Sequence, residues 1–94
     1  MTMTQDRAET VALTCLGWLA ASEDLLPVFL GATGASEADL RARAAEPEFL
    51  GSVLDFLLMD DAWVMACCGD AGLSPEAPAL ARAALPGGER VEWT

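Results

Sequence analysis

Residues 47–58, PEFLGSVLDFLL, decide the fold class, because they predict a helix that is apolar around most of its circumference. Pro47 suits the first position of a helix, where no backbone N–H is required. The remaining polar strip is narrow and contains Glu48, Ser52 and Asp55. A helix of this kind is buried on nearly all sides, so it lies at the centre of an all-α domain.

Capping residues predict five further short helices, and no segment alternates apolar and polar residues for long enough to form a strand. Gly34 and Gly72 suit the left-handed position that ends a helix. Ser36 with Asp39 resembles a capping box, and Ser74 with Pro75 suits the N-cap and first position of the last helix. The expected helices are about 6–21, 22–34, 36–45, 47–59, 60–72 and 74–85, with Pro27 favouring a later start for the second, near Leu26.

An internal repeat is suggested by the spacing of these boundaries. When the chain is shifted by 38 residues, residues 13–36 align with 51–74 without a gap, and Gly34 falls on Gly72. The pattern predicts two three-helix units, about 6–45 and 47–86, packed into one compact domain that spans 1–94, with a loose tail at 87–94. The alternative is that short helices rich in Ala and Leu resemble one another.

The net charge of −10, from 15 acidic residues and 5 arginines, limits the partners of this 94-residue chain. Basic residues supply most of the attraction to nucleic acids and to anionic membrane surfaces, so neither is expected as a partner. A basic protein surface remains open, although a negative charge also simply maintains solubility. The chain contains no His and no Lys, which removes His-activated nucleophiles, His metal ligands and Schiff-base chemistry, so an enzyme is not expected.

The N-terminal segment lacks the basic region of a signal peptide, because acids flank Arg7 before the apolar residues begin. The longest apolar region, 49–68, carries Asp55, Asp60 and Asp61, which oppose insertion into a membrane. Three cysteines, an odd number, do not form a disulfide framework. These features predict a cytoplasmic protein.

The stretch MDDAWVMACCGDAG, residues 59–72, combines adjacent aspartates with adjacent cysteines. Asp60 and Asp61 suit the start of a helix, where an oxygen acceptor and a negative charge are stabilising. Neighbouring residues on a helix point about 100° apart, so Cys67 and Cys68 do not converge on one ion. The favoured interpretation is that the cysteines fill the core, and Cys68 is the candidate reactive thiol if it is exposed.

The most plausible function from the sequence is a protein–protein interaction module, with no cofactor, metal or catalytic residue assigned. The expected partner is an unidentified protein, for example one with a basic surface, or a second copy of the chain. A thiol- or metal-responsive sensor and a binder of small apolar ligands are the alternatives. An exposed tryptophan at 18, 63 or 93 would also mark a partner surface. The candidate partner surface is acidic and consists of Glu46, Glu48, Asp55, Asp60 and Asp61.

FLGSVLDFLLMDDA (49–62), followed by GLSPEAPALARAALPGG (72–88), resembles a family of small, mostly alphaproteobacterial proteins catalogued as a domain of unknown function, DUF family 3572. The segment 12–45, ALTCLGWLAASEDLLPVFLGATGASEADLRARAA, is similar to the usual opening of that family. The resemblance covers about residues 8–88 and implies no activity, cofactor or site. The cysteine pair and Pro27 are not features of that resemblance.

Overall fold

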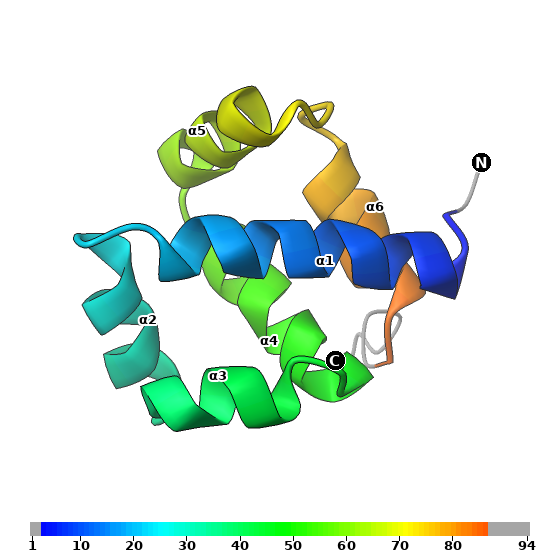
Figure 1. The fold of residues 1–94 in the computed structure, drawn as a ribbon. Coiled ribbons are helices and arrows are strands. Elements are labelled where there is room, and N and C mark those ends of the chain that lie inside the picture. Colours follow the sequence, from blue (N-terminus) through cyan, green and yellow to red (C-terminus); the bar gives the residue numbers. More distant parts are fainter. Residues whose placement is uncertain (1–2, 87–94) are drawn as a thin grey trace, which may run out of the picture.

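Six α-helices form the regular structure of residues 3–86, the part of the chain that this computed structural model describes (Figure 1). The all-α class is therefore confirmed over these residues, while the predicted tail at 87–94 lies outside them. The helices are α1 (Gln5–Ala20), α2 (Leu25–Thr33), α3 (Glu37–Arg43), α4 (Pro47–Leu57), α5 (Asp61–Ala71) and α6 (Ala77–Ala84).

The core lies between α1, α4 and α6, because α1 packs along both of the other helices (Figure 1). The buried face of α1 consists of Ala8, Val11, Ala12, Cys15, Leu16 and Leu19. On its buried face α6 carries Ala77, Pro78 and Ala81. These side chains are small, so the axis of α6 can approach those of α1 and α4 closely. α4 buries seven of its 11 residues, as its sequence predicts. α2 and α5 pack on the flanks of this centre.

Four aromatic rings join the flanking helices to α4. Phe29 of α2 lies edge-on to both Phe49 and Phe56, with ring centroids 6.2 Å and 5.2 Å away. Phe56 also stacks on Trp63 of α5, at a centroid distance of 4.8 Å. Aromatic pairs in these geometries add about 0.5–1.5 kcal/mol beyond their burial. The position of α5 therefore depends on a single stacked pair as well as on its aliphatic contacts.

The predicted helix caps mostly form. Gly34 and Gly72 end α2 and α5 in the left-handed conformation, at φ 75° and 73°. Ser36 and Asp39 exchange side chain–backbone hydrogen bonds in a complete capping box. α2 begins at Leu25, whose N–H donates to Ser22 Oγ. Pro27 therefore falls in the first turn, where its missing N–H costs no intrahelical bond.

The predicted start of the last helix is wrong by about two residues. Ser74 and Pro75 were expected at the N-cap and first position, but α6 begins at Ala77. The backbone N–H of Ala77 donates to the Ser74 carbonyl, so residues 74–77 form a separate turn. Pro78 then occupies the first turn of α6 and provides the proline start that Pro75 was expected to give.

The predicted repeat is not established by this arrangement. The two left-handed glycines do recur at the expected spacing of 38 residues. However, α6 packs extensively on α1 and α4, whereas α3, its counterpart in the first unit, buries only Leu40. Matching helix boundaries therefore do not extend to matching packing, and the duplication stays a prediction.

Candidate interaction surface

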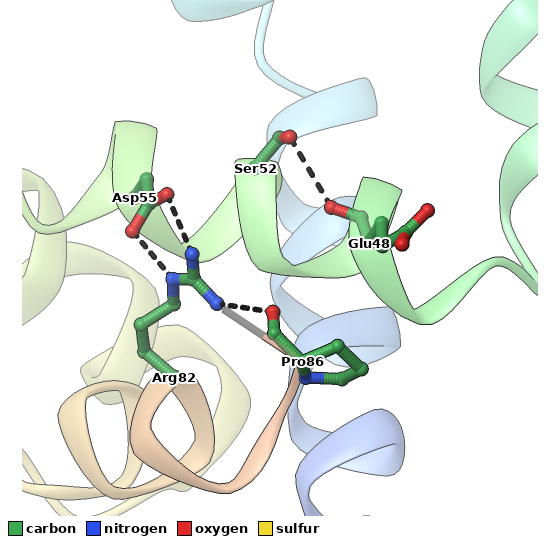
Figure 2. A network of polar contacts seen from close by, with 5 residues as sticks. All are labelled: Glu48, Ser52, Asp55, Arg82 and Pro86. Carbon is green, nitrogen blue, oxygen red and sulfur yellow. Dashed lines mark hydrogen bonds and ion pairs between the residues drawn. The ribbon is translucent and has the colours of Figure 1, made fainter. Parts of the chain in front are cut away.

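Asp55, one of the five predicted surface acids, is held in an ion pair with Arg82 of α6 (Figure 2). Arg82 Nε and Nη2 donate to the two carboxylate oxygens of Asp55 at 2.6 Å and 3.1 Å, and Nη1 donates to the Pro86 carbonyl at 3.1 Å. A Cβ at Gly51 would lie 2.8 Å from Arg82 Nη1, so the absence of a side chain there makes room for the guanidinium. We call this arrangement the α4–α6 clasp.

Glu46 and Glu48 lie together at the start of α4. Glu46 accepts a hydrogen bond from Arg43 Nε at 3.1 Å, and the side chains of Arg43 and Glu46 are each about half exposed. Arg43 also lies over the Phe49 ring, 4.9 Å from its centroid. Glu48 belongs to the first turn, where a negative charge favours the helix dipole, and its carboxylate points away from Arg82 in Figure 2.

Asp60 and Asp61 lie beyond the opposite end of α4, at the start of α5. Asp60 is the N-cap, and its Oδ1 accepts from the Ala62 N–H at 2.8 Å, as the capping interpretation predicts. Asp61 occupies the first turn and is exposed. An 11-residue helix is about 16 Å long, so the two acidic pairs are separate. The five acids therefore form two groups, with Asp55 engaged between them in the α4–α6 clasp.

The outer face of α5 is a surface that the sequence interpretation missed. Its inner face buries Val64, Cys67 and Cys68. At about 100° per residue the opposite side presents Ala62, Met65, Ala66 and Gly69, all exposed. We call these four residues the α5 face. The signal was present in the sequence, because the three- and four-residue spacing of these positions places them opposite the cysteines.

Met65 is the one large apolar side chain of the α5 face, and Met59 lies just before the helix. Met65 is 57% exposed, and Met59, which precedes the N-cap of α5, is 72% exposed. Within residues 3–86, the other exposed large hydrophobic residues are distributed singly, with Leu13 on α1, Val28 on α2 and Leu80 on α6. Single exposed apolar residues are common on protein surfaces. Among residues 3–86, Met59 and Met65 have the largest exposed fractions of the large hydrophobic residues, and they are six residues apart in the sequence.

The three cysteines lie in the core, as the favoured interpretation predicts. Cys15 and Cys67 are fully buried, and Cys68 is 3% exposed. Hydrogen bonding between the Cys15 and Cys67 thiols raises the pKa of Cys15 and lowers that of Cys67. Burial raises the pKa of the Cys68 thiol, with smaller contributions from Cys67 and Glu76. Low exposure and a raised pKa both disfavour a reactive thiol at Cys68.

Two of the tryptophans pack against the protein, and Trp93 lies outside the described residues. Trp63 stacks on Phe56. Trp18 is half-buried, and its Nε1–H donates to Asp70 Oδ2 at 2.9 Å, which links α1 to α5. Trp18 and Asp70, with Ala21 and Ser22, line a cavity of about 330 Å³ that is open to solvent.

Within residues 3–86, no group of three or more Cys, Asp or Glu side chains is arranged to hold a metal ion. Across the same residues, no single helix has the length and hydropathy needed to cross a membrane. α1 and α2 reach both only as a pair, with a bend of 116° between them.

Residues 5–88 match the model of a family described as protein of unknown function (DUF3572). The chain belongs to this family. No curated protein and no solved structure matches the chain. The family named from the sequence is thus confirmed, while its mostly alphaproteobacterial distribution stays a prediction. Membership in DUF3572 assigns neither an activity nor a partner to these surfaces.

Proposed function

We propose that this DUF3572 protein is a cytoplasmic interaction module whose acidic surface binds a basic surface on another protein. The observation that carries the proposal is the excess of carboxylates without a basic neighbour. The net charge is −10, and residues 3–86 contain two ion pairs, Arg43–Glu46 and Arg82–Asp55. Glu48 and Asp61 are exposed and take part in neither pair. A field of unpaired acids attracts basic partners and accelerates their association.

The same excess of negative charge opposes binding to nucleic acids or to anionic membranes. The proposal assigns the chain no catalytic role, because it contains neither His nor Lys. The buried position of Cys68 weakens the thiol-sensor alternative. Two surface cavities within residues 3–86 do not favour an apolar ligand, because Asp70 lines one and Glu37 and Arg41 line the other.

The test is an affinity capture from the lysate of the native host at low and at high salt, with mass spectrometry of the retained proteins. A matched variant, E48Q/D61N, removes two charges that belong to neither ion pair of residues 3–86. The proposal predicts a basic partner that is retained at low salt, lost at high salt and weakened by the variant. The absence of an enriched protein, together with a monomer in light scattering, would contradict the proposal.

A further inference from the structure

The α5 face has the geometry of one side of a helix–helix contact. α5 packs on α1 and α4 through its inner side, and it lies at the periphery of the molecule (Figure 1). Its 11 residues extend for about 16 Å, which corresponds to three turns of a partner helix. Among residues 3–86, no atom would lie within 4 Å of a Cβ at Gly69, so the C-terminal end of this face is uncovered by the described part of the chain.

The side chains of the α5 face suit an apolar partner. Ala62, Ala66 and Gly69 are small and allow a second helix axis to approach closely. Met65 lies about one turn after Asp61, at the Asp61 edge of this face, and Met59 is a second exposed thioether just before the N-cap of the helix. Methionine side chains are flexible and polarisable, so they adapt to partners of different shape. A hydrophobic residue just before the N-cap often packs against the helix, but Met59 is 72% exposed and remains accessible.

The charges around this face define the chemistry of the partner. Asp61 lies on one edge of α5 and Asp70 on the other, while Asp60 caps its start. No Arg or Lys occurs in α5. A second copy of the chain would bring another net charge of −10 to this surface and would be repelled. A helix with one apolar stripe between two rows of basic side chains would match both the methionines and the aspartates.

We propose that the α5 face, together with Met59, is the docking site for a basic amphipathic helix of another protein. This inference rests on the proposed function and names its surface and its partner class. The partner inserts its apolar stripe against Met65 and Ala66, and its basic side chains lie beside Asp61 and Asp70. Glu46 and Glu48, about one helix length away, contribute to attraction at a distance rather than to contact.

The test uses two synthetic peptides of Leu and Lys, each about 18 residues or five helical turns long. One peptide places its leucines on a single helix face, and the other has the same composition in scrambled order. Fluorescence anisotropy measures the binding of each peptide to the full chain at physiological ionic strength. The proposal predicts that the patterned peptide binds at least about tenfold more tightly than the scrambled one, because only it presents an apolar stripe.

Three variants locate the site on the protein. Met65→Lys places a like charge against the peptide, and Ala66→Glu adds an acid to the centre of the contact. Val28→Lys is the matched control, because Val28 is 49% exposed on α2 and the change in charge equals that of Met65→Lys. The proposal predicts about tenfold weaker binding for M65K and A66E and little change for V28K. Simple charge attraction predicts the opposite for A66E, whose added acid would strengthen binding.

Three results would overturn the docking site: equal binding of both peptides, equal effects of M65K and V28K, or tighter binding by A66E. A wild-type dimer that M65K dissociates in sedimentation would identify a second copy as the occupant and would also overturn it. The lysate capture distinguishes these failures from failure of the proposed function. If wild type and A66E capture the same basic partner equally well, the protein is still an interaction module, but the α5 face is not its docking site. All three substitutions are at exposed positions, and circular dichroism checks that each variant is folded.

Discussion

Asp55 and Asp61 are both exposed aspartates on short helices, yet the α4–α6 clasp and the start of α5 use them differently. Asp55 faces the guanidinium of Arg82 and ties two helices together (Figure 2). Asp61 has Met65 one turn further along α5 and takes part in neither ion pair of residues 3–86. The comparison shows that the role of a carboxylate depends on what the fold places opposite it. In the clasp that neighbour is inside the chain, whereas at α5 we infer that it is another protein.

The largest expected loss of stability comes from removing the aromatic contact between α4 and α5. Phe56→Ala removes a side chain that is 3% exposed, contacts Phe29 and stacks on Trp63. Truncation of a buried Phe costs about 3–5 kcal/mol of unfolding free energy. Urea unfolding measures the loss, and a cost below about 1 kcal/mol would show that the stacked pair does not hold α5 in place.

The next largest effect tests whether the α4–α6 clasp stabilises the protein more than an ordinary surface ion pair does. Arg82→Met keeps much of the apolar stem but removes the bidentate pair and the bond to Pro86, and we expect a loss of about 1–2 kcal/mol. The Asp55 side chain is 58% exposed, so solvent screening keeps the loss below that of a buried pair. A double-mutant cycle with Asp55→Asn measures the coupling. Additive losses would show that the pair contributes nothing.

A smaller effect concerns the inner side of α5. Burial raises the pKa of Cys68 above its ordinary value of 9.0, so the folded state retains a proton that the unfolded chain releases. The contribution of Cys68 to the free energy of unfolding is complete below the pKa of its thiol in the unfolded chain, and it decreases as the pH rises through the alkaline range. We expect Cys68→Ala to reduce the slope of unfolding free energy against pH between about pH 8.5 and 10. Parallel slopes for wild type and variant in chemical unfolding would contradict a raised pKa.

The smallest expected effect on stability is at the α5 face itself. Met65→Lys replaces a side chain that is 57% exposed, and its unfolding free energy should stay within about 0.5 kcal/mol of wild type. Thermal and urea unfolding check this value. A loss above about 2 kcal/mol would mean that Met65 packs against the protein and is not free for a partner.

Local signals in the sequence predict most of the fold. Gly34 and Gly72 end their helices because the left-handed conformation is strained for other residues, and Pro47 begins α4 because its ring suits a first turn. These effects depend on a few neighbouring residues. The start of α6 was misplaced because two prolines, Pro75 and Pro78, both suit a helix start and only the backbone turn at Ser74 selects between them.

The candidate site was harder to predict, because it depends on residues that are distant in sequence. Asp55 and Arg82 are 27 residues apart, and only the packing of α4 on α6 brings them together. The predicted acidic surface therefore counted Asp55 as available when the fold engages it. The exposure of Met65 likewise depends on which side of α5 faces the core, which is decided by the packing of the helices.

The most direct measurement is an NMR titration of the ¹⁵N-labelled chain with the patterned Leu/Lys peptide. The docking-site proposal predicts that the backbone amide shifts concentrate in residues 59–70, around Met65 and Ala66, and that A66E requires about tenfold more peptide to produce them. Shifts centred on Glu46 and Glu48, or shifts spread evenly over the acidic residues, would contradict the account, because they would show that charge alone brings the peptide to this protein.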